Sequence, residues 1–462
     1  MKKYREFISN TMIFAIGGIG TKVILFLLVP LYTHYLTPQE YGISDLVFTI
    51  SQFIVPIITL TIYDAVTRFG LSVNEKKSDV LLSAFIVWIL GTIVLIVFSP
   101  FISLYTAISD WKWYLVVYVI LNGGIQIGLN YLKVIDKNKT FAIVSILNSI
   151  ILVLLNLVLI VFLHTGIRGY LISNIGASFI TIVIILFVGR IIHTLKLAKF
   201  DKDLLMRMVL FSAPLVLNNI SWWAIHSTDK IMINAMVSAT ALGIYTVSSK
   251  IPSLINVFTG FFVQAWGLSS IKEVETTNET RFYSNVFKTF TASIFILCVF
   301  INCFIKPFMT IYTSEAFSNS WMYVPVLLVA ATFNAVSSFF GTLYSALKKT
   351  INNMITTIIA AAVNVVVNYV FILIVGTWGA AIGTITSYFV VAYIRLFNVK
   401  KYIDFEIDWK RHILSVMIVF IHMITVTLEF HTYVMSLTAL LLLLCINMET
   451  IKMTILTLKR ER

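Results

Sequence analysis

The chain has 462 residues, of which 59% are hydrophobic and only 12% are charged. A soluble domain has roughly 45–50% apolar and about 25% charged residues, so this composition excludes a soluble enzyme. The net charge of +13 could suggest a nucleic-acid partner, but the basic residues gather in alternate loops. We therefore expect an integral membrane protein that binds no nucleic acid.

About fourteen apolar runs of membrane-spanning length follow one another from Ile8 to Leu458. The connections are short, and every second one is rich in lysine and arginine, starting with the basic segment Lys2–Arg5. This is the positive-inside pattern, in which basic loops stay in the cytoplasm. It predicts an all-α membrane protein with both termini cytoplasmic.

A weak internal repeat relates the two halves. Tyr41–Ile43 resembles Leu242–Ile244 at an offset of 201, and Gly169–Ile172 resembles Gly379–Ile382 at an offset of 210. The repeat predicts two pseudo-symmetric six-helix lobes and an added C-terminal helix pair. The expected parts are an N-terminal lobe (1–190), a cytoplasmic linker (191–203), a C-terminal lobe (204–399) and helices 13 and 14 with a cytoplasmic tail (400–462).

Charged residues inside the spans are few, and they gather in helices 1, 2, 7 and 8, the first pair of each lobe. They are Lys22, Asp45, Asp64, Arg68, Asp229, Lys230 and Lys250. Because an ionisable group in hydrocarbon costs several kcal/mol, we expect these side chains to line a wet cavity where the lobes meet. The lysines are then substrate-binding candidates, and Asp45, Asp64, Asp229 and His226 are candidates for coupling to an ion.

Helical spacing supports such a cavity. Helix 2 places Asp45, Thr49, Gln52 and Pro56 within one arc, and helix 7 does the same for Asn219, Trp223, His226 and Lys230. Lys250 lies off the polar stripe of helix 8, and only a kink at Pro252 could bring it round. Gln52, Asn219 and Trp223 therefore join the substrate-binding candidates, because amides and indoles suit the hydroxyls and faces of sugars.

Each of these residues also has a plainer interpretation. Asp64 and Arg68 are spaced i, i+4 and could pair within one helix. His226 and Trp223 could serve packing alone, and Lys22 could extend its ammonium to the membrane surface. These alternatives stay open at the level of sequence.

A cationic cavity with amide and aromatic walls suits an amphiphile whose head carries negative charge and hydroxyls, such as a lipid-diphosphate sugar. Helices 13 and 14 could extend a groove for the lipid tail. The sequence has no Ser/His/Asp spacing, no metal-ligand cluster and no large external loop. We therefore expect a transporter without cofactor or metal, and not an enzyme.

Several segments resemble the bacterial oligosaccharide-lipid flippases of the polysaccharide type. They are FLLVPLYTHYLTPQEYGISDL, YDAVTRF, SAPLVLNNISWWAIHSTDKIMI, GIYTVSSKIPSLINVF and QAWGLSSIKE. This family belongs to the multidrug/oligosaccharidyl-lipid/polysaccharide exporter superfamily, and the resemblance implies its MATE-like fold. It also implies movement of undecaprenyl-diphosphate-linked repeat units of O-antigen or capsule across the inner membrane by alternating access.

The resemblance carries over residue by residue at Lys22, Asp45, Lys230 and Lys250, which match charged family positions. Lys230 stands where relatives commonly have arginine, so the bidentate geometry is lost. The implied partners are the lipid-linked glycan, membrane lipids and polysaccharide polymerase or assembly proteins, and we expect a monomer. One alternative is a lipid II flippase, since a count of fourteen spans resembles that group, and another is a cation or drug exporter. A proton gradient, a sodium gradient and the membrane potential all stay open as the driving force.

Overall fold

The computed structural model describes residues 20–72, 74–275, 280–450 and 452. These residues form helices and turns, with no strand among them. Twelve of the described helices are long and apolar enough to cross a membrane, and Ala239–Ser248 and Thr432–Ile446 are shorter apolar helices. The prediction of an all-α multi-pass membrane protein with about fourteen spans is confirmed. The predicted cytoplasmic termini and the outer ends of the first and last spans lie outside the described residues.

The chain divides into two compact units, Met1–Ser227 and Thr228–Arg462. The division falls inside α9 (Lys202–Met236), so this helix belongs to both units. The sequence analysis instead expects the boundary at a linker, 191–203. These expected domain boundaries stay a prediction. The first unit contains helix 20–35, α2 (Pro38–Thr59), α3 (Ile62–Gly70), α4 (Lys77–Ile102), η1 (Thr106–Trp111), α5 (Lys112–Val134), α6 (Asn138–Asn156), η2 (Leu157–Phe162), α7 (Gly166–Val188), α8 (Ile191–Lys196) and the start of α9 (Lys202–Met236).

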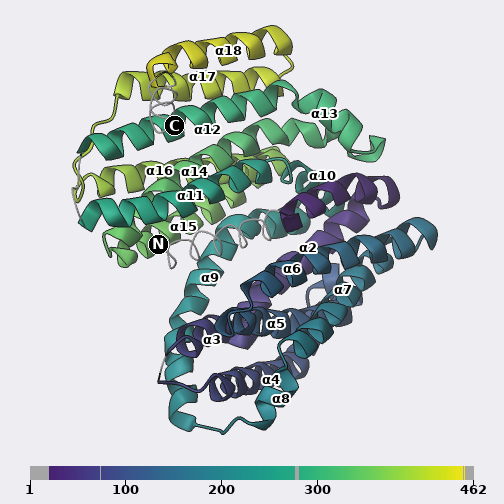
Figure 1. Ribbon diagram of the computed structural model, residues 1–462. Helices are drawn as coiled ribbons and strands as arrows, with labels where there is room; N and C mark the ends of the chain where they lie inside the picture. Colours follow the sequence, from purple (N-terminus) through teal and green to yellow (C-terminus); the bar gives the residue numbers. More distant parts are fainter. Residues whose placement is uncertain (1–19, 73, 276–279, 451, 453–462) are drawn as a thin grey trace. The chain divides into compact units, whose positions relative to one another are not determined.

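Helix α5 is the core of the first unit. It contacts α2, α3, α4, α6 and α7, and with η1 it forms the most buried span of this unit (Figure 1). Leu115, Val119, Ile127 and Leu132 along α5 are completely buried. Because lipid tails are as apolar as these side chains, close packing and polar contacts, rather than exclusion from water, hold such helices together.

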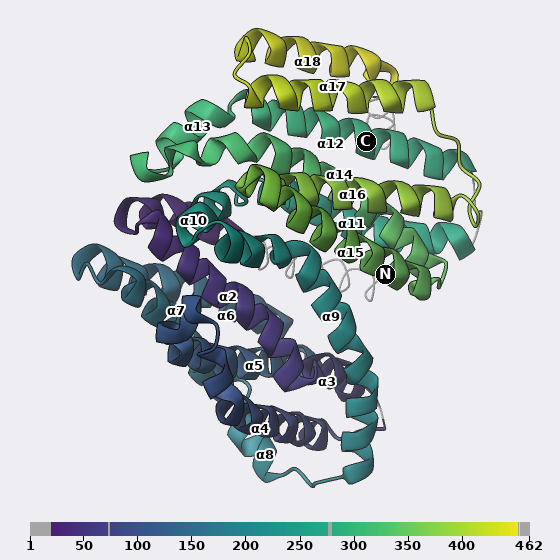
Figure 2. The same ribbon diagram turned by 180° about the vertical axis from the view of Figure 1, so that it is seen from behind.

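The second unit contains the end of α9, α10 (Ala239–Ser248), α11 (Ser253–Glu275), α12 (Thr280–Cys303), α13 (Ile305–Tyr312), η3 (Glu315–Tyr323), α14 (Val324–Ala346), α15 (Thr350–Val375), α16 (Thr377–Val399), α17 (Trp409–Thr427) and α18 (Thr432–Ile446). Helix α14 is its most buried span and contacts α11, α12, α15, α16 and α17 (Figure 2). The added pair α17 and α18 packs on α12. The fourth span is therefore the core helix in both units.

Local signals at equivalent places confirm the internal repeat. Thr37 caps α2, with a side-chain oxygen 3.2 Å from the backbone nitrogen of Glu40, and Ser238 caps α10 in the same way. These caps are 201 residues apart, the offset of the first repeat pair. Gly166 and Gly376 are the described glycines with positive φ, 58° and 60°, and stand 210 residues apart at the start of α7 and α16.

The second span of each unit is broken. In the first unit, α2 ends after Pro56 at Thr59, and Leu60 and Thr61 adopt φ of 47° and 50° before α3 begins. Such values strain non-glycine residues, and the Thr61 hydroxyl donates a 2.9 Å hydrogen bond to the Ser212 carbonyl of α9. In the second unit, the residues 249–252, with Pro252, separate α10 from α11.

The predicted linker docks on the first unit. Ile191 in α8 and Leu204 at the start of α9 are buried in the core cluster that α3, α4 and α5 form. The Lys199 backbone N–H donates a 2.8 Å hydrogen bond to Asp79, and Arg207 pairs with Glu75 at 2.8 Å. This segment therefore has fixed contacts and is not a free tether.

Candidate functional site

A buried carboxylate in the second unit joins three helices. Asp229 on α9 is 6% exposed, and its Oδ2 accepts a 2.8 Å hydrogen bond from the Tyr245 hydroxyl of α10. The Thr384 hydroxyl of α16 lies 3.5 Å from the same oxygen, and Oδ1 accepts from the Lys230 backbone N–H at 2.8 Å. Tyr388 of α16 is close enough to interact electrostatically. A buried carboxylate requires hydrogen-bond donors or a counter-ion, and a bound ion could take the place of the hydroxyl donors.

A row of buried amides continues from this carboxylate. The Asn368 amide donates to Asn364 at 2.9 Å, Asn364 donates to the Ser387 hydroxyl at 3.3 Å, and Ser387 donates to the Thr384 carbonyl at 2.9 Å. All four side chains are buried between α15 and α16. The sequence interpretation missed this row, although Asn364 and Asn368 at i, i+4 and Thr384 and Ser387 at i, i+3 give it a helical spacing that could have revealed it.

The first unit also buries a carboxylate beside tyrosines. Asp45 on α2 is 9% exposed and lies close enough to Tyr170 of α7 to interact with it electrostatically. The Tyr32 ring packs edge-on against Tyr170 with centroids 4.6 Å apart, and the Asn156 amide donates a 2.8 Å hydrogen bond to the Tyr32 hydroxyl. Each unit thus holds one buried aspartate in an aromatic and polar surrounding.

Asp64 has a different partner from the one its spacing suggests. Arg68 is exposed, and no ion pair joins these two described residues. Asp64 instead interacts electrostatically with Lys133 of α5, whose ammonium lies 3.2 Å from the Asn130 side-chain oxygen and 4.5 Å from the Phe141 ring centroid. Asp64 therefore belongs to a polar contact of α3 with α5.

Trp223, one residue of the polar stripe on α9, packs on α2. The Trp223 indole N–H donates a 2.7 Å hydrogen bond to the Thr49 carbonyl, and its ring lies 4.6 Å from Phe53. Asn219 is partly buried, whereas Gln52 and His226 are exposed. His226 stacks on Trp222 with centroids 5.8 Å apart. The indole N–H of Trp223 is thus already used to hold α9 on α2, and its remaining surface is what a ligand could contact.

The three candidate lysines occupy different surroundings. Lys22 on helix 20–35 is exposed, and Lys230 on α9 is partly buried. Lys250 is partly buried in the break that separates α10 from α11. The expected kink at Pro252 is therefore a full interruption of the helix. Broken helices in the same span of two repeats often mark the binding site of a transporter, because the freed backbone groups can bind ligands.

The described residues contain no group of three or more His, Cys, Asp or Glu side chains that could hold a metal ion. The Asp229 carboxylate and the hydroxyls of Tyr245 and Thr384 beside it are oxygen ligands of the kind that a small hard cation prefers. Binding of a proton or a cation at Asp229 stays a prediction.

The chain is similar to known proteins. A family model described as "Polysaccharide biosynthesis protein" matches residues 7–267. A search of curated protein sequences found no match. The solved structure of the lipid II flippase MurJ in an inward closed conformation is 15% identical, with a TM-score of 0.67 over 94% of this chain and 98% of that chain.

Multidrug transporter structures are similar as well. An inward-facing MATE family transporter of the MOP superfamily is 15% identical, with a TM-score of 0.65 over 84% of this chain and 93% of that chain. A MATE in complex with MaL6 is 17% identical, with a TM-score of 0.62 over 85% and 95%. At these identities the likeness establishes the fold, which is that of multi-pass membrane transporters.

Proposed function

Because the chain belongs to the polysaccharide biosynthesis protein family, we propose that it moves an undecaprenyl-diphosphate-linked oligosaccharide from the cytoplasmic to the periplasmic leaflet. The cargo is a repeat unit of a surface polysaccharide such as O-antigen or capsule, and the mechanism is alternating access. The observation that carries the proposal is the position of two lysines of the second unit. Lys230 lies inside the apolar span Lys202–Met236, and Lys250 lies in a helix break.

Lysines at membrane depth suit a diphosphate better than an organic cation. An ammonium stabilises phosphate oxygens by charge-assisted hydrogen bonds, and these are stronger where bulk water is scarce. Lys22, Lys230 and Lys250 would bind the diphosphate. Asn219, Trp223 and Gln52 would contact the sugars, with the Trp223 ring face as the stacking surface.

Asp229 is the proposed ion-coupling residue. Its partners come from three helices, so binding of a proton or a sodium ion would change contacts of α9 with α10 and α16 at once. Asp45 is the corresponding candidate in the first unit. Asp64 and His226 are weaker candidates, because the first interacts electrostatically with Lys133 and the second stacks on Trp222.

The proposed location is the bacterial inner membrane, with both termini in the cytoplasm as the basic loops predict. The glycan polymerase and other assembly proteins are proposed partners, since the flipped unit must next be polymerised. The protein is proposed to act as a monomer, without cofactor and without catalysis of its own.

A lipid II flippase is the second candidate. The observation that favours it is the match to a structure with that function over 94% of this chain, against 84–85% for the multidrug transporters. A cation or drug exporter is the third, and the lysines disfavour it because they would repel a cationic cargo.

Deletion of the gene, followed by analysis of lipids and surface glycans, separates these candidates. The proposal predicts loss of one surface polysaccharide and accumulation of its lipid-linked repeat unit inside the cell. Accumulation of lipid II would instead identify the second candidate. Increased drug sensitivity with normal lipid-linked glycans would identify the third and contradict the proposal.

A further inference from the structure

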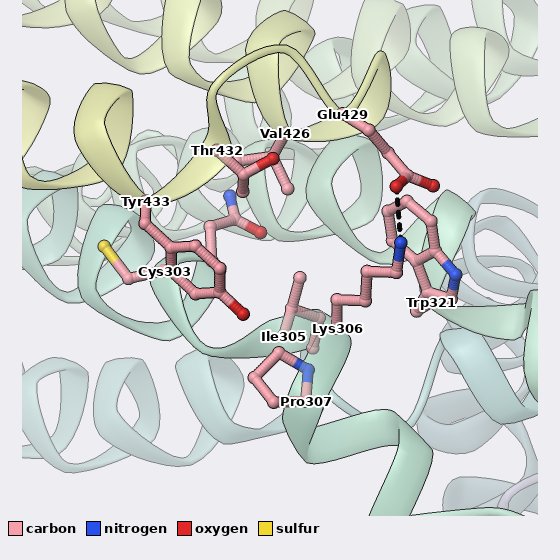
Figure 3. A pocket seen from close by; sticks show the side chains of 10 residues that line it. Cys303, Ile305, Lys306, Pro307, Trp321, Val426, Glu429, Thr432 and Tyr433 are labelled. Atoms are coloured by element: carbon pink, nitrogen blue, oxygen red, sulfur yellow. Dashed lines mark hydrogen bonds and ion pairs between the residues drawn. The ribbon is translucent and has the colours of Figure 1, made fainter.

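A small pocket in the second unit has none of the residues of the proposed site in its lining. The end of α12, the start of α13, η3 and the turn that joins α17 to α18 surround it (Figure 3). Its cavity volume is about 20 Å³. A cavity of this size holds a group as large as one water or one ammonium, and a sugar ring is several times larger.

The pocket already stabilises one primary ammonium, that of Lys306. Figure 3 shows Lys306 extending to the Glu429 carboxylate, with Trp321 beside the pair. The ammonium lies 5.0 Å from the Trp321 ring centroid, so it has a carboxylate and an aromatic face as partners. Both charged side chains are 48% exposed, so each can also contact a second group.

Asn302 provides unused hydrogen-bonding capacity in the same pocket. It lines the cavity and is 1% exposed, yet neither its amide nitrogen nor its oxygen has a hydrogen-bond partner among the described residues. A buried amide without partners costs free energy, which an apolar residue of the same shape would avoid. The amide therefore favours a polar group in the cavity, either a water or the polar end of a ligand.

The turn that carries Glu429 is strained. Glu429 and His431 adopt φ of 55° and 41°, values that are uncommon for residues other than glycine. Backbone strain of this kind is common at ligand-binding turns, where the surrounding structure holds the backbone in an unfavourable conformation. Here it holds the carboxylate of Glu429 over the rim of the pocket.

The pocket opens where spans end. Thr280–Cys303 and Trp409–Thr427 are candidate spans, and the pocket lies directly after both. Tyr433, which lines the pocket, is 70% exposed, and Phe304 and Leu428, which adjoin lining residues in the chain, are 56% and 71% exposed. Exposed aromatic and aliphatic side chains at the end of a span are typical of contact with lipid chains below the head groups.

We infer that this pocket binds the phosphoethanolamine head group of a phospholipid. The phosphate pairs with Lys306, and the ammonium donates to Glu429 and to the Asn302 amide oxygen. The zwitterion offers an opposite charge to each member of the Lys306–Glu429 pair, whereas an anionic glycerol head group offers one to Lys306 alone. A choline head group has no N–H to donate, and its three methyl groups exceed the cavity.

Native mass spectrometry of the full chain tests this inference. The probes are dioleoyl phosphatidylethanolamine, phosphatidylcholine and phosphatidylglycerol, added in turn to detergent-solubilised protein. We expect phosphatidylethanolamine to bind about tenfold more tightly than the other two, as expected for a charged hydrogen bond. Glu429→Gln should remove this preference, and so should Asn302→Leu.

Glu75→Gln is the matched control, because it neutralises the carboxylate of a second ion pair among the described residues, the pair with Arg207. It should leave the preference unchanged. Glu429 is half exposed, so its variant is expected to fold even if the buried Asn302→Leu variant does not. Equal binding of the three lipids, or an unchanged preference in Glu429→Gln, would overturn the inference. Neither result depends on which cargo the protein transports.

Discussion

The hydroxyl of Tyr245 on α10 donates a 2.8 Å hydrogen bond to the carboxylate of Asp229 on α9, and both side chains are buried. Thr384 of α16 reaches the same carboxylate oxygen. Under the proposed coupling, a proton or a cation on Asp229 would weaken or rearrange these contacts. The contacts of the carboxylate would then differ between the ion-bound and the ion-free state, as a coupled transporter requires.

Asp229→Asn should abolish transport while leaving the protein inserted in the membrane. The amide keeps the shape and can still accept from Tyr245, but it can neither take up a proton nor bind a cation by charge. Surface glycan in a complemented deletion strain measures the effect. Asp110→Asn, at an exposed aspartate, is the control and should behave as the wild type. Normal glycan in Asp229→Asn would exclude Asp229 as the coupling residue.

Lys22→Ala and Lys230→Ala should each reduce flipping about tenfold at low cargo concentration, because each removes a charged contact to phosphate. The double variant should be more defective than either. Lys76→Ala, at an exposed loop lysine, should have no effect. Membrane abundance of each variant shows that folding is intact. If surface glycan is normal in both single variants and in the double variant, these lysines are not phosphate ligands.

Arg395 is expected to be a structural residue. Its guanidinium donates to the Ser337 and Asn353 carbonyls and to the hydroxyls of Thr356 and Thr357, and so connects α14, α15 and α16. Arg395→Ala would leave these buried acceptors without a donor, at a cost of about 3 kcal/mol or more. Thermal unfolding in detergent should show a clearly lower melting temperature.

The control for this variant is Arg68→Ala, because Arg68 is exposed. Its substitution should change the free energy of unfolding by less than about 0.5 kcal/mol. An Arg395→Ala protein as stable as Arg68→Ala would show that the four hydrogen bonds of Arg395 contribute little.

Gly383→Ala should destabilise the packing of α15 on α16. A Cβ at Gly383 would lie 1.9 Å from the Asn368 side-chain oxygen, so the amide row would have to move. Overpacking of this kind costs typically 1–3 kcal/mol. Gly260→Ala is the matched variant, because a Cβ there meets nothing within 4 Å, and it should stabilise α11 by up to about 1 kcal/mol. Equal unfolding temperatures of the two variants would contradict this.

Much of the fold is predictable from the sequence because membrane spans and repeats have strong local signals. Thr37 and Ser238 are helix-cap residues at the repeat offset of 201. Gly166 and Gly376 supply positive φ at the repeat offset of 210. The break at Leu60 and Thr61 could not be predicted. Neither residue is glycine or proline, and Pro56 alone indicates a kink rather than two left-handed residues four positions later.

The candidate site was only partly predictable. Sequence spacing identifies Asp229 as a charged residue in a span, but its partners Tyr245 and Thr384 come from segments 16 and 155 residues away. The choice of Lys133 rather than Arg68 as the partner of Asp64 is likewise decided by the packing of α3 on α5. Spacing gives contacts within one helix, whereas these contacts depend on which helices become neighbours.

Transport by the purified protein is the most direct test of the proposed function. The protein would be reconstituted in vesicles with undecaprenyl-diphosphate-linked oligosaccharide, and the fraction of glycan accessible on the far leaflet would be followed over time. The proposal predicts protein-dependent movement of this lipid that an ion gradient accelerates and that Asp229→Asn removes. Movement no faster than in protein-free vesicles, together with efflux of an organic cation by the same preparation, would contradict it.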